Sequence, residues 1–153
     1  MTGFDIACQM AGSCLCFRAR KLSRLITRTY DEALRPLGLQ ATQVTLLSAV
    51  AMGKDQGLSM PRIAAALATD LSTLSRNLRP LERDGAISIG RAEDDRRVRI
   101  ARITAKGEAL LEAAWPKWQK AHEKVAALIG DAQTLREQVD LAIAGMAQNQ
   151  PRK

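Results

Sequence analysis

The chain has 153 residues, of which 46% are hydrophobic, so it can build one domain of ordinary size, and disorder or a miniature fold held by disulfides is disfavoured. Lysine and arginine number 23 against 16 aspartates and glutamates, which leaves a net charge of +7 and predicts a polyanionic partner. Because aromatic residues make up only 3% of the chain, a surface that stacks single-stranded bases is disfavoured, and duplex nucleic acid or an acidic membrane face remains.

The sequence also bears on the compartment. No apolar run approaches the roughly 18 residues that a membrane-spanning helix needs, and the start of the chain lacks the basic and then apolar segments of a signal peptide. Three cysteines, Cys8, Cys14 and Cys16, lie close together, and this odd number fits free thiols in a reducing compartment. We therefore expect a cytoplasmic protein without a membrane partner.

Apolar residues recur at helical spacing over the first half of the chain. They predict a long helix over residues 13–35, which Pro36 and Gly38 end. Capping residues and glycines then bound three shorter helices, at residues 42–53, 59–67 and 70–84. Only a tight turn separates the last two, which predicts a helix-turn-helix.

After Gly85 the spacing changes to the alternation that is typical of strands. Residues 87–100 are predicted to form a two-stranded hairpin around a charged turn at residues 91–97. Two long helices are predicted at 104–130 and 131–148, and residues 150–153 are expected to fray. The predicted fold class is mainly α with a small β-hairpin wing: a winged helix-turn-helix between long N- and C-terminal helices.

The fourth helix has a leucine side and a polar side. The leucines are Leu71, Leu74, Leu78 and Leu81, and the outward set is Ser72, Thr73, Arg76 and Arg83, with Arg79 at the border. Arginine can pair with two acceptors of guanine, and serine or threonine can reach bases or phosphates, so the outward set suits a major groove. The alternative is an ordinary core helix whose polar residues are only solvated.

The turn of the hairpin region is rich in arginine. Five arginines lie within a dozen residues, which is more positive charge than a solvated turn needs: Arg91, Arg96, Arg97, Arg99 and Arg102. A tip this narrow can place one arginine in the minor groove while its neighbours contact phosphates. The helix and the hairpin together therefore predict an interface with double-stranded DNA, to which the wing contributes Arg91, Arg96 and Arg97.

Two motifs make the prediction more specific. Asp95-Arg96-Arg97 is followed by Ile103-Thr104-Ala105-Lys106-Gly107, and the fourth helix ends in Leu81-Glu82-Arg83-Asp84-Gly85. These stretches resemble the wing signature and the recognition-helix ending of the MarR family of winged-helix transcription regulators, with isoleucine at 103 where leucine is usual. The resemblance covers nearly the whole chain. It implies an obligate homodimer, a wing whose Arg97 enters the minor groove, and an Asp95 that orients the wing.

The expected organisation is one domain over residues 1–153 with two lobes. Residues 42–104 form the winged DNA-binding lobe, and residues 8–36 and 105–148 form a helical dimerisation lobe. Independently of the resemblance, the terminal helices carry apolar faces broader than a lone winged domain can cover, such as the stripe of Leu135, Val139, Ile143 and Met146. A two-fold dimer reads a pseudo-palindrome, with its recognition helices about 34 Å apart.

Cys16 is a candidate redox residue. Leu15-Cys16-Phe17 with Tyr30 resembles the organic-hydroperoxide-sensing (OhrR-type) branch of the family, in which the matching cysteine is oxidised, although Arg20 stands where a second tyrosine is usual. The alternative is a small buried residue of the dimer interface, the commoner role of a free cysteine. A bond between Cys14 and Cys16 is disfavoured, because the two side chains would point about 200° apart on one helix.

A small-molecule inducer is the other candidate signal. Other members of the family bind small, often aromatic, anionic ligands between the dimerisation helices and the winged motif. The resemblance therefore implies that Tyr30, Trp115, Trp118 and nearby arginines line such a pocket, although packing alone would equally account for both tryptophans.

An enzyme is disfavoured, because the chain lacks a phosphate-binding glycine-rich loop, a His-Glu-x-x-His zinc motif and a Gly-x-Ser-x-Gly elbow. The cysteines and the single histidine, His122, do not have zinc-site spacing, so neither a metal nor a cofactor is expected. We predict a sequence-specific regulator that represses transcription until a ligand releases it, with peroxide sensing through Cys16 as the alternative. A non-specific architectural protein is the remote alternative, since it has no use for side chains aimed at base edges.

Overall fold

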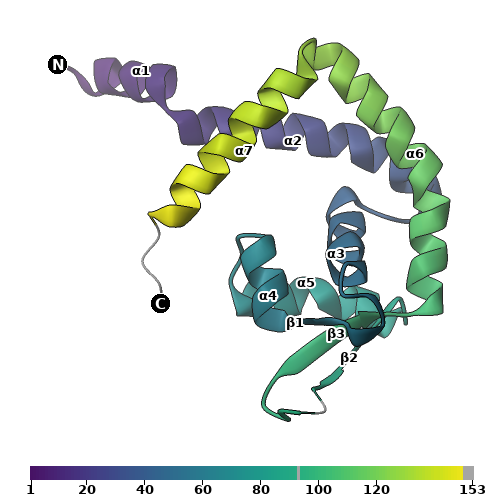
Figure 1. Cartoon of the computed structure of the whole chain (residues 1–153). Helices are drawn as coiled ribbons and strands as arrows, with labels where there is room; N and C mark the ends of the chain where they lie inside the picture. Colours follow the sequence, from purple (N-terminus) through teal and green to yellow (C-terminus); the bar gives the residue numbers. More distant parts are fainter. Residues whose placement is uncertain (93, 150–153) are drawn as a thin grey trace.

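The computed structural model describes residues 1–92 and 94–149 (Figure 1). Its helices are α1 (Gly3–Ser13), α2 (Leu15–Leu34), α3 (Ala41–Ala51), α4 (Met60–Ala66), α5 (Leu71–Arg83), α6 (Ala105–Ile129) and α7 (Ala132–Gln148), and its strands are β1 (Leu58–Ser59), β2 (Ile87–Arg91) and β3 (Arg99–Ile103). Two 3₁₀ turns cover Arg35–Leu37 and Lys54–Gln56. Glu93 of the charged turn and the tail expected to fray, residues 150–153, lie outside the described residues. The predicted class, mainly α with a β-hairpin wing, is confirmed.

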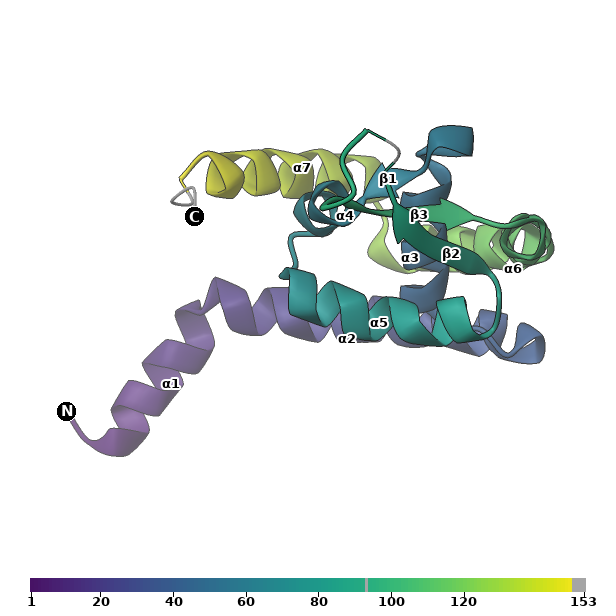
Figure 2. The same ribbon diagram turned by 90° about the horizontal axis from the view of Figure 1, so that it is seen from below.

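The elements form a helical part and a winged part. Figure 1 shows α1, α2 and α7 at one end of the molecule and α4, α5 and the sheet at the other, with α3 between them, while α6 runs along one side from the sheet to α7. Seen from below, α5 and the β2–β3 hairpin share the face that is turned toward the viewer (Figure 2). Among the helices of the described ranges, none combines the length and the apolar character needed to cross a membrane.

The sheet has three antiparallel strands, in the order β1-β3-β2, where the sequence predicted only two. In the hairpin Ile87 pairs with Ile103 and Arg91 with Arg99. The additional strand β1 places Leu58 opposite Ala101. Two residues are too few to show an alternating pattern, and pairing across more than forty residues leaves no local signal, so β1 was missed.

The predicted helix over residues 13–35 is interrupted near its start, and a separate helix, α1, precedes the break. Cys14 lies between the two helices with extended backbone angles, and its Sγ accepts a hydrogen bond of 3.3 Å from the Phe17 amide. Cys14 is therefore the N-cap of α2 rather than a residue inside a helix. The sequence argument against a bond between Cys14 and Cys16 assumed one continuous helix, and that assumption is wrong.

The core of the winged part is apolar and continuous. Leu74, Leu78 and Leu81 of α5 are buried in it, together with residues of α3, α4 and the sheet. Leu71 was predicted on the same buried side, but it is 49% exposed. It lies one turn before Leu74, where α5 extends beyond the core.

A hydroxyl joins α6 to the end of α5. Thr104 caps α6 by accepting from the Gly107 amide at 3.2 Å, and its Oγ1 donates to the carbonyls of Gly85 at 2.7 Å and Ala86 at 3.0 Å. The ammonium of Lys106 donates to the Asp84 carbonyl at 2.6 Å. We call these contacts the α5–α6 junction. They supply a physical reason for the Thr-x-x-Gly part of the signature.

Gly107 is the residue of the junction that tolerates substitution least. A Cβ at this position would lie well inside contact distance of the Ala86 carbonyl oxygen and close to the Ile103 side chain. We expect Gly107→Ala to lower the free energy of unfolding by about 1–3 kcal/mol, measured by denaturant unfolding. The control is Gly145→Ala, in the interior of α7 with open space around it, which should raise the free energy by about 0.5–1 kcal/mol. Equal effects of the two substitutions would contradict this description of the junction.

Candidate nucleic-acid interface

Asp70 organises the first turn of α5. Its Oδ1 accepts from the Ser72 hydroxyl at 2.5 Å and from the Thr73 amide at 2.8 Å, and its Oδ2 accepts from the Thr73 hydroxyl at 2.7 Å. These hydrogen bonds hold the pKa of the Asp70 carboxyl far below its ordinary value, so the group is a carboxylate at neutral pH. Sequence reasoning selected Ser72 and Thr73 and did not identify their shared partner.

The polar side of α5 faces outward as predicted. Ser72, Arg76, Arg79 and Arg83 are exposed, while Thr73 is half-buried. Arg79 was predicted at the border, but it lies in solvent like the other arginines of this helix. The Arg83 Nε is 3.3 Å from the Asp84 carboxylate, an exposed pair that adds little stability.

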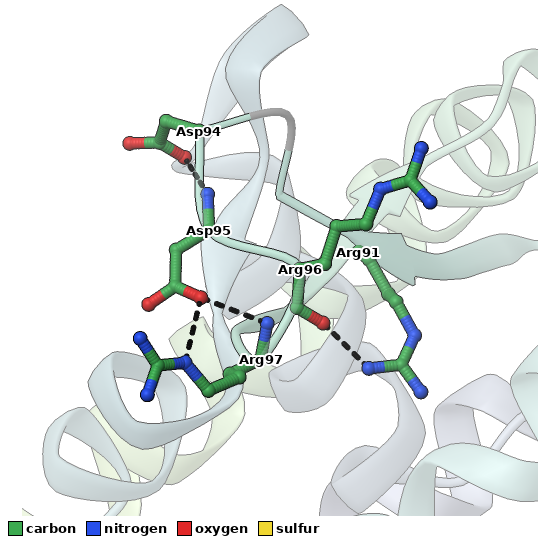
Figure 3. Close-up of polar contacts among 5 residues, drawn as sticks. All are labelled: Arg91, Asp94, Asp95, Arg96 and Arg97. Atoms are coloured by element: carbon green, nitrogen blue, oxygen red, sulfur yellow. Dashed lines mark hydrogen bonds and ion pairs between the residues drawn. The ribbon is translucent and has the colours of Figure 1, made fainter.

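The wing tip is ordered by two hydrogen-bonded arginines (Figure 3). The Asp95 carboxylate accepts from the backbone amide of Arg97 at 2.9 Å and from its Nε at 3.3 Å. On the other side of the turn, Arg91 Nη1 donates to the Arg96 carbonyl at 2.5 Å. The side chains of Arg96 and Arg97 remain exposed. The Asp-x-Arg spacing therefore places the Asp95 carboxylate where it holds the turn, while the guanidiniums of Arg96 and Arg97 stay exposed at the surface of the turn.

A hollow of about 830 Å³ lies between the β2–β3 hairpin and residues 55–62, which include β1 and the first turn of α4. Three arginines line it, Arg62 of α4, Arg91 of β2 and Arg102 of β3, and Asp55, Asp94 and Asp95 line it as well. The sequence did not single out Arg62. The missing signal was β1, which brings the beginning of α4 beside β3.

The single tyrosine, both tryptophans and the single histidine of the chain form one aromatic cluster. Trp118 stacks on Trp115 with ring centroids 5.5 Å apart and on His122 with centroids 5.0 Å apart. The Tyr30 hydroxyl lies 3.1 Å from His122 Nδ1, and burial raises the pKa of Tyr30. His122 is exposed, and its bond to Tyr30 has no signal in the sequence, because 92 residues separate the two.

Two hollows adjoin this cluster and share Thr27, Ala41 and Thr45. One, of about 230 Å³, is lined by Tyr30 and Trp118; the other, of about 320 Å³, extends toward α5. Trp115, predicted to line a pocket, is 56% exposed and is not among the residues around either hollow. Within the described ranges the two linings contain threonine, asparagine, rings and apolar groups but not the arginines expected from the sequence.

Cys16 and Tyr30 are not brought together within one chain. Both lie on α2, and at 1.5 Å per residue their fourteen-residue separation corresponds to about 21 Å along the helix. Cys16 is exposed in the first turn of α2 in the single chain, and its burial in a dimer interface stays a prediction. Contact between this thiol and a tyrosine would therefore need a second copy of the chain.

Comparisons with known proteins agree with this geometry. A family model described as MarR family matches residues 37–98. The HTH-type transcriptional regulator BilQ of Clostridium symbiosum (strain WAL-14163) is 35% identical over 74 residues, which is 48% of this chain and only about half, 51%, of that relative.

Two solved structures extend the likeness over most of the chain. The M. tuberculosis transcriptional regulator MosR, in complex with DNA, has 32% sequence identity and a TM-score of 0.78 over 90% of this chain and 100% of MosR. CouR from Rhodococcus jostii RHA1, bound to p-coumaroyl-CoA, has 20% identity and a TM-score of 0.72 over 93% of this chain and 97% of CouR, which is a likeness of fold.

The geometry of the wing yields a prediction that does not depend on any ligand. We expect Asp95→Ala to release Arg97, because it removes the acceptor of both the amide and the guanidinium. The heteronuclear NOE of the Arg97 amide should fall. Asp94→Ala is the control, since Asp94 accepts only from the adjacent Asp95 amide among the bonds of the described turn. An Arg97 amide that is equally ordered in both variants would contradict the orienting role of Asp95.

Proposed function

The chain belongs to the MarR family of transcription regulators, and from this premise we propose that it is a sequence-specific regulator that binds double-stranded DNA as a homodimer on a pseudo-palindromic operator. One observation carries the proposal. α5 buries Leu74 and Leu78 and leaves Arg76 exposed, and the helix shares one face of the molecule with the β2–β3 hairpin that carries the wing (Figure 2). Such a surface offers base-reading donors beside phosphate-binding cations.

In this proposal the winged DNA-binding lobe is residues 42–104. Ser72, Thr73, Arg76, Arg79 and Arg83 of α5 enter the major groove. From the wing, Arg97 enters the adjacent minor groove while Arg91 and Arg96 contact phosphates. The side chains of the wing arginines are exposed, as this role requires.

Dimerisation is proposed for the helical lobe, residues 8–36 and 105–148. The support is the amount of apolar side chain that a single chain leaves in water on α1, α2 and α7: Phe4, Met10, Leu15, Phe17, Val139, Leu141, Ile143 and Met146. A monomer rarely exposes so many large apolar side chains on neighbouring helices, and a two-fold partner would bury them against copies of themselves. α1 begins at Gly3, before the predicted start of this lobe.

We further propose that the regulator is a repressor released by a small aromatic ligand. Two hollows support this: one between α2, α3 and α6, where Tyr30 and Trp118 offer ring faces, and one between α2, α3 and α5, where threonines offer hydrogen bonds. The CouR structure holds p-coumaroyl-CoA, an aromatic acyl thioester, in the same fold. A ligand releases DNA if it binds better to the dimer in which the recognition helices no longer match successive grooves.

The second candidate signal is oxidation of Cys16, whose thiol is exposed in the single chain and lies in the lobe proposed to dimerise. Organic hydroperoxides oxidise cysteine thiols to sulfenic acid, so this residue type suits such a signal.

The DNA proposal is tested by pairing one base-reading and one phosphate-contacting arginine. We expect Arg76→Ala to cost about 1–3 kcal/mol on the selected site and to relax sequence choice, whereas Arg96→Ala should weaken all duplexes about equally and flatten the salt dependence. Binding is measured by fluorescence anisotropy on selected and random duplexes, with exposed Arg136→Ala of α7 as the control. Equal losses on both duplexes for both variants would favour a non-specific architectural protein instead.

The redox alternative has its own test. Cys16→Ser should leave DNA affinity unchanged and abolish release by an organic hydroperoxide if the thiol is the sensor. Cys8→Ser, which removes an exposed thiol of α1, is the matched control. If the Cys16 variant still releases DNA when the hydroperoxide is added, the redox hypothesis is wrong and the small-molecule ligand remains as the signal.

A further inference from the structure

The hydroxyls of Ser72 and Thr73 have no hydrogen left to donate to another molecule. Both donate to the carboxylate of Asp70, and a carboxylate can only accept. Each hydroxyl carries a single hydrogen, so what it can still offer to another molecule is an oxygen lone pair. Serine and threonine normally act as either donor or acceptor, and here Asp70 commits both to accepting.

This polarity matters in a major groove. Adenine N6 and cytosine N4 present amino donors there, whereas guanine presents two acceptors and thymine presents one together with a methyl group. An oxygen that can only accept forms a hydrogen bond with the amino groups and none with guanine O6 or thymine O4. The Asp70 carboxylate, itself exposed, adds a negative charge that also disfavours acceptor atoms nearby.

We propose that Asp70 is a specificity-determining positioning residue, which makes the first turn of α5 select bases that carry an amino group in the major groove. The inference rests on the proposed function, because it assumes that α5 enters DNA. One turn further along, Arg76 can only donate and therefore selects acceptors. The two turns of α5 thus read opposite hydrogen-bond polarity, adenine or cytosine first and guanine beside it.

The experiment is selection of bound sites from random duplex DNA with the full-length chain. Ser72→Ala and Thr73→Ala first identify the base positions that the first turn reads, as the positions whose preference they relax. Wild type should enrich adenine or cytosine at these positions on the contacted strand. Asp70→Ser retains an oxygen to cap the Thr73 amide but frees the hydroxyl hydrogens, so discrimination against guanine and thymine should fall about tenfold.

Two further variants make the result specific. Asp131→Ser removes the N-cap carboxylate of α7, which accepts from the Thr134 amide, and should leave every base preference unchanged. Asp70→Asn keeps an acceptor for the Thr73 amide while its NH₂ donates to a hydroxyl, so it should relax the same positions if Asp70→Ser does not fold. The guanine preference attributed to Arg76 should persist in both Asp70 variants.

The outcomes separate the two levels of the proposal. If wild type enriches guanine or thymine at the first-turn positions, or if the Asp70 variants keep the wild-type preference, the role of Asp70 is overturned while DNA binding stands. A wild type that enriches no sequence overturns the proposed function itself and this inference with it.

Discussion

The α5–α6 junction is the contact on which the rest of the structure depends. The Thr104 hydroxyl links the segment that follows α5 to the start of α6. It donates to the Gly85 and Ala86 carbonyls after α5 and accepts from the Gly107 amide in the first turn of α6. Gly107 has no side chain to separate the two backbones, and Lys106 adds a charge-assisted bond to the Asp84 carbonyl. The proposed recognition helix α5 is therefore attached to the long helix that leaves the winged part, and we expect the two to move as one body.

Through this attachment a movement in the helical part can reach the surface proposed to bind DNA. Leu34 of α2, Val44 of α3 and Ala114 of α6 are buried together, and Tyr30 and Trp118 pack against them. We propose that a ligand too large for the hollows beside this cluster displaces α2 relative to α3 and α6. Because a packed core is bistable rather than continuously deformable, a small displacement can become a rotation of the whole winged part. The proposed ligand response needs no flexible element in α5 itself.

The parts of this protein that the sequence predicts best are those with short-range patterns. The burial of Leu74, Leu78 and Leu81 follows from helical periodicity. The bond from Arg97 to Asp95 agrees with the orienting role of Asp95 that the family resemblance implied, and it spans only two residues of one turn. The features that were missed depend on tertiary contacts, namely strand β1 and the bond between Tyr30 and His122.

Two errors had local causes of a different kind. Leu71 has the right phase for burial, but the core ends before it, and periodicity does not report where a core ends. The break at Cys14 depends on a thiol acting as an N-cap, a role for which serine, threonine, aspartate and asparagine are the usual signals. Asp70 stands at the start of the helix predicted over residues 70–84, but only the side-chain geometry shows that it accepts from the hydroxyls of Ser72 and Thr73.

The most direct test of the central claim is pulsed electron–electron double resonance between two nitroxide spin labels. The labels are attached to cysteines that replace Glu82 of α5 and Glu112 of α6, both exposed, after the native cysteines have been replaced by serine. Labels on one subunit of a mixed dimer report the distance within a chain, and a Glu82 label on each subunit reports the distance between recognition helices. The account predicts an unchanged distance within the chain on DNA binding, while the distance between subunits narrows to one distribution near the spacing of successive grooves, about 34 Å between helix centres. A distance between α5 and α6 that changes on DNA binding would contradict the claim that the two helices move as one body.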